Sequence, residues 1–396
     1  MGGTGGNLVA RILRRTLGAL LLLLLIVFFG IGAVVERFLN RLDPVALPEV
    51  SEAARALHAS SLVADMHADS LLAGRNLLRR SRVGHVDLPR LQEGGVGLQF
   101  FTAATVVPLG LNVQRNESDA FDLITLLGIA QLSPFAWRGP LGRAELQADR
   151  LEETIAGSGG ALRLVRTRAD LEALLAERAQ GGRPIGALLG IEGAHALEGD
   201  LANLDVVFAR GFRMIGLTHF FDNEFAGSAH GAQKGGLTGL GRALVRRMQE
   251  IGVLVDLAHL SPSAIDEVLA MATRPTVVSH GGVKGTCPSE RTLSDEHVRA
   301  IAAGGGVIGI GYWETAVCGR EPRQVVAAMR HVVSLVGDDH VGLGSDYDGA
   351  TTVGFDTSQL AALTQQLVSD GFSDESIRKI LGGNVVRVLR QVLPER

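Results

Sequence analysis

Short apolar runs alternate with amphipathic segments along most of the chain after residue 51. Each run ends in glycine or polar residues, and the segments that follow repeat apolar positions at helical spacing. Such runs are typical of strands buried on both faces, and such segments are typical of helices that cover them. The runs are Leu62–Ala64, Val96–Phe101, Gly186–Ile191, Phe212–Leu217, Gly252–Leu257, Thr276–Val278, Val307–Ile310 and Val341–Leu343.

Eight β/α alternations in about 340 residues predict an α/β fold, a (β/α)₈ TIM-like barrel. A doubly wound open sheet is the alternative, but no GxGxxG motif follows the first run. The extra length between Thr105 and Ala161 predicts an elaborated loop and a helix pair. Helices are predicted at 168–179, 240–250, 263–272 and 295–303, and at 357–390 with a break at Gly382–Asn384.

One long apolar stretch stands outside this alternation. Residues 16–35 carry no charge and match the hydrocarbon thickness of a bilayer, which predicts a transmembrane helix. Arg11, Arg14 and Arg15 precede it, so we expect a cytoplasmic N-terminus and a catalytic body outside. A cleaved signal peptide is the alternative, but its apolar core is usually shorter. The predicted parts are 1–15 in the cytoplasm, 16–35 as the anchor, 36–50 as a linker and 51–396 as the barrel.

Composition narrows the class of protein. Apolar residues make up 46% of the chain, which is enough for the core of an enzyme-sized domain. The net charge is −4 and basic residues do not cluster along the body, so a nucleic-acid partner is excluded. Two cysteines, Cys287 and Cys318, cannot form a four-cysteine zinc site. In an exported protein they could form a disulfide, and otherwise they are two buried thiols.

Metal-ligating side chains follow most of the apolar runs. In a barrel of this kind the active residues lie at the carboxyl ends of the strands. Four of the eleven histidines fall at such positions, together with several carboxylates. Imidazole and carboxylate groups are the ligands that a divalent metal such as zinc prefers. The predicted ligands, sufficient for two metals, are His67, Asp69, Glu192, His259 and His280.

Other polar residues near these run ends have predicted roles beside the metals. Glu192 closes an apolar run, so its carboxylate needs a positive partner, either a metal or Arg213. His219 is a candidate for polarising a substrate, and Arg291 could hold a carboxylate through a bidentate fork. Asp346 could orient a water molecule or carry its proton. His195 is expected to steady a ligand by a hydrogen bond, and Asp348 to cap a turn.

Together these motifs resemble the membrane dipeptidase (renal dipeptidase) family, a branch of the amidohydrolase-like metal barrels. The resemblance covers most of residues 55–393, with its blocks in the order of the family. The blocks are DMHADS at 65–70, VDLPRLQEGGVGLQFF at 86–101, IEGAHAL at 191–197, GLTHFFDNEFAGS at 216–228, GVLVDLAHLSP at 252–262, PTVVSHG at 275–281, R-x-L-S-D at 291–295, GLGSDYDG at 342–349 and GGNVVRV at 382–388.

The resemblance implies a binuclear zinc dipeptidase, with two Zn²⁺ per chain and a hydroxide between them. It implies that His67 and Asp69 bind the first zinc, that His259 and His280 bind the second, and that Glu192 bridges them. It further implies a dipeptide substrate and a homodimer. Its implied catalytic and substrate-binding residues are His219 for the oxyanion, Arg291 for the substrate's carboxylate and Asp346 for the proton.

Two other functions remain open at this point. One is a different metal-dependent amidohydrolase, such as a lactonase, a phosphotriesterase, a deaminase or a β-lactam or amide hydrolase; the first three usually begin with HxH, whereas this chain has His67-x-Asp69. The other is a catalytically silent, membrane-tethered binding domain, which would be expected to lack some ligands. Animal members of the family typically carry a C-terminal lipid anchor, whereas this chain ends in the polar segment 393–396. We therefore expect the N-terminal helix to serve as the anchor, in a bacterial envelope protein.

Overall fold

Eight parallel strands close into a barrel in this computed structural model, which describes residues 5–125 and 139–395 (the side chains of 5–8 and 27–35 excepted). β10 pairs with both β8 and β11, and β11 pairs with β2, so the sheet has no open edge there. This closure confirms the predicted (β/α)₈ barrel and excludes the doubly wound sheet. The strands are β2 (Val63–Asp65), β3 (Val96–Ala104), β5 (Ile185–Glu192), β6 (Phe212–Gly216), β7 (Leu254–Asp256), β8 (Val277–Val283), β10 (Val307–Ile310) and β11 (Val341–Leu343).

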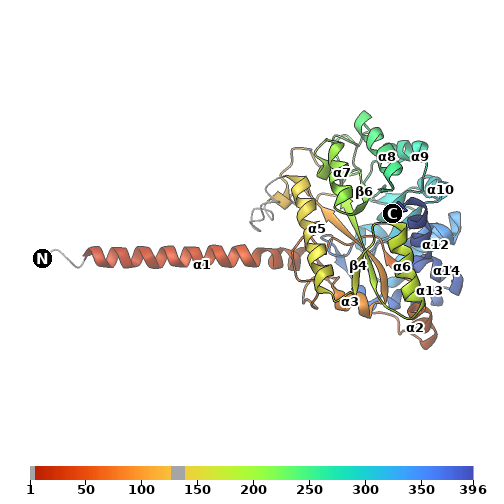
Figure 1. Ribbon diagram of the computed structural model, residues 1–396, viewed down its shortest axis with the longest axis horizontal. Coiled ribbons are helices and arrows are strands. Elements are labelled where there is room, and N and C mark those ends of the chain that lie inside the picture. The colour runs from red at the N-terminus through yellow and green to blue at the C-terminus, as the bar shows by residue number, and fades with distance from the viewer. Residues whose placement is uncertain (1–4, 126–138, 396) are drawn as a thin grey trace.

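Helices surround the barrel on its outside (Figure 1). α6 and α10 have the predicted bounds, and α8 and α9 differ from them by one residue at each end. α6 begins at a capping box in which Thr167 and Asp170 satisfy each other's backbone N–H groups. The helices are α2 (Glu52–Ala59), α3 (Leu88–Glu93), α5 (Pro140–Gly157), α6 (Arg168–Ala179), α7 (Ala202–Ala209), α8 (Gly239–Ile251), α9 (Pro262–Met271), α10 (Asp295–Ala303), α11 (Glu314–Val317), α12 (Pro322–Val336), α13 (Ala361–Ser369), α14 (Asp374–Arg378) and α15 (Asn384–Val392).

The C-terminal helices break where the sequence predicted it. A π-helical turn, Lys379–Gly383, separates α14 from α15. A Cβ atom on Gly382 would lie 2.4 Å from the carbonyl oxygen of Leu62, so only glycine allows this approach to the start of β2. Apolar side chains of α15, such as Leu389, share a core cluster with Leu98 and Leu188 of the strands. This packing fills the barrel and leaves the carboxyl ends of the strands for the site.

Several short elements were not predicted. β4 (Leu162–Leu164) pairs with β5, β9 (Thr292–Leu293) pairs with β8, and β1 (Arg41–Leu42) pairs with β12 (Thr352–Val353). In the elaborated region, α5 is the described helix, and residues 126–138 lie outside the described residues. Cys287 and Cys318 form a disulfide, which decides between the two states that the sequence left open.

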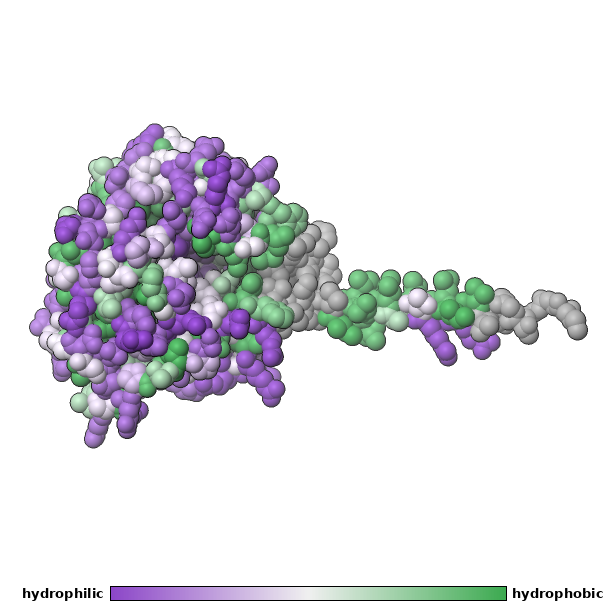
Figure 2. All heavy atoms as spheres, turned by 180° about the vertical axis from the view of Figure 1, so that it is seen from behind, coloured by the Kyte–Doolittle hydropathy of each residue, from purple (hydrophilic) through white to green (hydrophobic). Residues whose placement is uncertain are grey.

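The N-terminal helix α1 (Gly5–Leu39) extends away from the barrel (Figure 1) and carries mostly apolar residues along its described length (Figure 2). Across the described residues, we find no helix that combines the length and apolar character needed to cross a bilayer. The side chains of 27–35, which belong to the predicted span 16–35, lie outside the described ones. The predicted linker, 36–50, begins inside α1 and includes β1.

Candidate metal centre

All the predicted ligands lie at the carboxyl end of the barrel. Glu192 is the last residue of β5, and His280 lies within β8. His67 and Asp69 follow β2, and His259 follows β7 in a left-handed backbone conformation with φ of 64°. The parallel strands bring these residues to one place although up to 213 positions separate them in the chain.

Glu192 lies at the centre of this group. Its Oε1 atom is 2.9 Å from Nε2 of His259, 3.3 Å from Nε2 of His280 and 3.6 Å from Nε2 of His67. Its Oε2 atom is 3.3 Å from Nε2 of His219. Three imidazoles from three different strands therefore direct the same nitrogen toward one carboxylate oxygen. Arg213, the other partner predicted for Glu192, instead donates to the backbone carbonyl oxygens of Arg166 and Phe208.

The ligands separate into two groups that share Glu192. One group is His67, Asp69 and Glu192, and the other is Glu192, His259 and His280. Within each group the potential ligand atoms lie within 4.8 Å of one another, and all five side chains are buried. Two neighbouring metal positions joined by one carboxylate fit this arrangement, because each position then has nitrogen and oxygen ligands of the kind that zinc accepts.

Neighbouring hydroxyl groups orient the ligands. The Oγ atom of Ser279 is 2.8 Å from Nδ1 of His280 and 3.2 Å from Nδ1 of His67. These contacts direct Nε2 of both rings toward Glu192. Thr102 donates to Oδ1 of Asp69 at 2.7 Å, which leaves Oδ2 facing His67. Such outer contacts fix the tautomer and direction of a metal ligand.

The electrostatics of the group also fit a divalent metal. Burial raises the pKa of Glu192 well above its usual range, and the nearby Asp69 carboxylate raises it further. Burial lowers the pKa of His259 and His280, so both rings are neutral and able to bind a metal. Burial opposes a charge on His67, but Asp69 and Glu192 outweigh it and raise the pKa of His67 to about 10. With this pKa, His67 holds a proton in the metal-free chain. A bound metal cation would replace the proton on His67 and neutralise the buried carboxylates.

His219, Arg291 and Asp346 line the same cavity, which has a volume of about 530 Å³. Nδ1 of His219 lies 3.2 Å from the carbonyl oxygen of Val106, and Nε2 lies on the side of Glu192. The guanidinium of Arg291 lies 5.6 Å from the centre of the Trp313 ring. Oδ1 of Asp346 is 3.9 Å from Nε2 of His67. The structure thus brings all eight predicted site residues together.

Two predicted roles are wrong. Neither ring nitrogen of His195 has a hydrogen-bond partner among the residues that the structure describes, so His195 does not steady a ligand by such a bond. Asp348 does not cap the following turn. Its carboxylate accepts hydrogen bonds from Ser70 and Arg75 and from the backbone N–H of His85, all of which belong to other segments.

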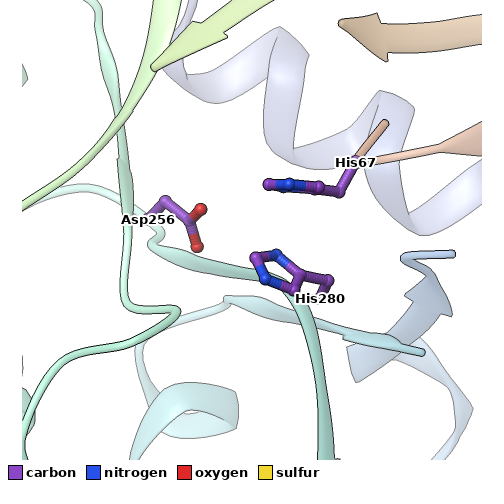
Figure 3. Close-up of side chains that lie close together, drawn as sticks. All are labelled: His67, Asp256 and His280. Atoms are coloured by element: carbon purple, nitrogen blue, oxygen red, sulfur yellow. The ribbon is translucent and has the colours of Figure 1, made fainter. Parts of the chain in front are cut away.

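Asp256, the last residue of β7, was missed by the sequence reasoning. Figure 3 shows its carboxylate directed toward the rings of His67 and His280, with which it forms a third potential ligand group. One oxygen, Oδ1, already accepts from the backbone N–H groups of Ala258 and Ser279. Its position at a strand end was a usable signal, but it lay inside a run that was assigned to the core.

Comparisons with known proteins agree with this geometry. A family model described as membrane dipeptidase (peptidase family M19) matches residues 51–394. Dipeptidase verJ of Clonostachys rogersoniana is 30% identical over 321 residues, which cover 79% of this chain and 77% of that protein. Dipeptidase tcpJ of Claviceps purpurea is 30% identical over 321 residues, covering 78% of this chain and 69% of that protein.

Solved structures share the fold. A crystal structure described as dipeptidase AC, a metallopeptidase of family M19, has 25% identity and a TM-score of 0.69, and the match covers 84% of this chain and 99% of that one. The probable dipeptidase PvdM of Pseudomonas aeruginosa has 21% identity and a TM-score of 0.72, with 87% and 98% covered. Since the family model spans the whole barrel, the chain belongs to the membrane dipeptidase family, peptidase family M19.

Proposed function

We propose that this protein is a binuclear zinc dipeptidase that hydrolyses the peptide bond of dipeptides. The observation that carries the proposal is the position of Glu192 Oε1, within 3.6 Å of Nε2 of His67, His259 and His280. His67 and Asp69 would hold one metal, His259 and His280 the other, and Glu192 both. When bound, the metals supply Lewis acidity that polarises a carbonyl and makes water a nucleophile near neutral pH.

His219 is the proposed group that stabilises the transition state. Its ring lies beside Glu192 and lines the cavity, so a carbonyl placed near the metal ligands would meet Nε2. This role requires the tautomer that carries the proton on Nε2, in which Nδ1 has no proton to donate to the carbonyl oxygen of Val106; the ring then donates to the oxygen on which negative charge develops. Burial lowers the pKa of His219 well below its usual range, so the ring acts as a neutral donor.

Asp346 is the proposed proton carrier. Burial raises the pKa of its carboxyl to about 7, although His67 partly opposes this. That value holds for the metal-free chain, and a carboxylate beside the metal ligands can take a proton from the attacking water and give it to the leaving amine. Oδ1 of Asp346 is 3.9 Å from Nε2 of His67, a proposed ligand of the first metal, which supports this role.

Arg291 is the proposed clamp for the free carboxylate of the substrate. It is half-buried, lines the cavity and lies against Trp313, which restricts the directions in which its donors can point. A fixed guanidinium fork binds a carboxylate through two parallel hydrogen bonds. With the scissile carbonyl at the metals and the carboxylate at Arg291, the clamp would limit the length of the substrate on the C-terminal side of the scissile bond.

A panel of dipeptides tests this function. Purified protein is assayed with L-L and L-D dipeptides, with tripeptides and with dipeptide amides, before and after a chelator. The proposal predicts hydrolysis of dipeptides, loss of that activity on chelation and its return with Zn²⁺. Equal hydrolysis of dipeptides and their amides would contradict the clamp, and activity that survives metal removal would contradict the metal mechanism.

We also propose that α1 attaches the protein to a membrane, with the barrel on the outer side. The large apolar side chains between Val9 and Ile26 are 45% to 69% exposed, which is unfavourable in water for a helix that extends from the body. Cell fractionation tests this attachment. The full-length protein should require detergent for release, and a variant with Leu21→Arg and Leu24→Arg should not. A parent protein that stays in the supernatant without detergent would contradict it.

A further inference from the structure

The end of α1 lies against the loop that carries Asp346. We define the junction as residues 36–43 and the catalytic loop as residues 345–353. The described side chains of the junction help to line the cavity of the site, together with Asp346 and Arg291. The family match begins at residue 51, so the junction lies outside the matched residues. The junction residues at the cavity are Glu36, Leu39, Asn40, Arg41 and Asp43.

A buried chain of charges joins the junction to the catalytic loop. Glu36, whose side chain is 2% exposed, forms an ion pair with Arg75. Arg75 in turn pairs with Asp348, whose side chain is 1% exposed. Asp348 also accepts from Ser70 at 2.6 Å and from the backbone N–H of His85 at 2.6 Å. Removing one of these side chains leaves a neighbouring charge buried without an opposite charge, which is costly. Each side chain therefore restricts the position of the next.

The backbone of the catalytic loop is held by the junction as well. The N–H of Ala350 donates to Oδ1 of Asn40 at 2.9 Å, and the N–H of Arg41 donates to the carbonyl oxygen of Thr351 at 3.1 Å. β1 and β12 then continue this contact as a parallel pair. The hydroxyl of Thr351 donates to the carbonyl oxygen of Asp346 at 2.8 Å. Three contacts therefore lead from the junction to the residue proposed to move the proton.

The catalytic loop has a backbone that needs such support. Asp346, Asp348 and Ala350 have φ values of 58°, 63° and 58°, in the left-handed region that residues with a Cβ atom rarely adopt. Each such residue costs about 1 kcal/mol or more unless the surroundings impose its conformation. The hydrogen bond from Ala350 to Asn40 and the ion pair of Asp348 are two of the contacts that impose it.

We propose that the junction is a positioning element of the active site, in which Asn40 and Glu36 hold the catalytic loop so that Asp346 faces the metal ligands. This inference rests on the proposed role of Asp346. The N-terminal helix is then part of the catalytic apparatus as well as a tether. Neither Asn40 nor Glu36 touches the reacting atoms, so both act through the loop.

Kinetics of full-length variants test the proposal. Asn40→Ala removes the acceptor for Ala350, and Glu36→Ala removes the carboxylate that pairs with Arg75. We expect each to lower kcat for a dipeptide by about tenfold, because a small misplacement of a catalytic group is costly. KM and metal content should stay close to the parent values. The conservative variants should restore most of kcat, because Asn40→Asp keeps an acceptor oxygen and Glu36→Asp keeps the negative charge. Arg37→Ala, an exposed neighbour on the same helix, is the matched control.

Other outcomes distinguish this inference from the function on which it rests. Parental kcat in both Asn40→Ala and Glu36→Ala would overturn the positioning role, as would a loss of kcat that only parallels a loss of bound metal. Equal effects of Asn40→Ala and Asn40→Asp would also overturn it. Asp346→Asn is assayed beside them. If it abolishes kcat while the junction variants do not, only the positioning inference fails. If it keeps kcat, the proposed role of Asp346 fails.

Discussion

Oε1 of Glu192 lies 2.9 Å from Nε2 of His259, and the same oxygen is also the point toward which His67 and His280 are directed. A carboxylate that ends a fully buried strand is costly to keep charged without a cation beside it. Its pKa is accordingly raised by burial and by Asp69 in the metal-free chain. The relationship therefore indicates a site that is completed by metals.

The two ligand groups should be separable by mutation. Asp69→Asn weakens only the group of His67, because Asp69 has no part in the group of His259 and His280. We expect this variant to retain about one metal per chain and to lose dipeptide hydrolysis, since both metals are needed around the substrate. Elemental analysis of dialysed protein measures the count. Two retained metals with full activity would remove Asp69 from the ligand set.

Arg291 should control recognition of the substrate's carboxylate. Arg291→Ala is expected to lower kcat/KM for dipeptides by roughly thirtyfold, or about 2 kcal/mol, mainly through KM. Dipeptide amides, which lack the carboxylate, should lose far less. Arg291→Lys keeps the charge without the fork and serves as the control, with an intermediate effect. The same loss on dipeptides and amides would show that Arg291 acts on the fold rather than on the substrate.

The raised pKa of Asp346 predicts that the folding stability of the metal-free protein decreases as the pH rises. Burial raises it from 3.8 to about 7. A folded-state pKa above the unfolded value contributes stability at low pH, and that contribution is lost as the pH rises from 3.8 through about 7. Metal-free Asp346→Asn should therefore gain stability relative to the parent over this interval. Thermal unfolding of both proteins in chelator at a series of pH values measures this gain. A difference in Tm between variant and parent that stays constant with pH would contradict a buried, uncompensated carboxyl at Asp346.

The disulfide should stabilise the fold and keep Arg291 in place. Cys287 and Cys318, which are separated by 31 positions, join the segment before Arg291 to the turn after α11. The chain-entropy estimate for a loop of this size is about 3–4 kcal/mol. We expect Cys287→Ser with Cys318→Ser to lower Tm and to raise KM for dipeptides. Unchanged Tm and KM in the double variant would mean that neither depends on the bond.

Much of the fold could be predicted because it depends on local pattern. A strand buried on both faces needs a continuous apolar run, and the carboxyl ends of parallel strands meet at one end of the barrel. That rule was enough to find Glu192, His259 and His280. The two-residue strands β1 and β9 carry too few residues for a pattern. The contacts of Asn40 with Ala350 and of Arg75 with Asp348 join distant segments, so no local signal marks them.

Zinc stoichiometry of the parent and of Glu192→Gln, measured with dipeptide hydrolysis on the same samples, tests the central claim most directly. If Glu192 joins two metal positions, the parent binds about two zinc ions per chain. The variant, which keeps the shape but loses the bridging charge, loses most of the zinc and all hydrolysis. A Glu192→Gln protein that keeps the parent's zinc content and hydrolyses dipeptides at the parent's rate would contradict the account.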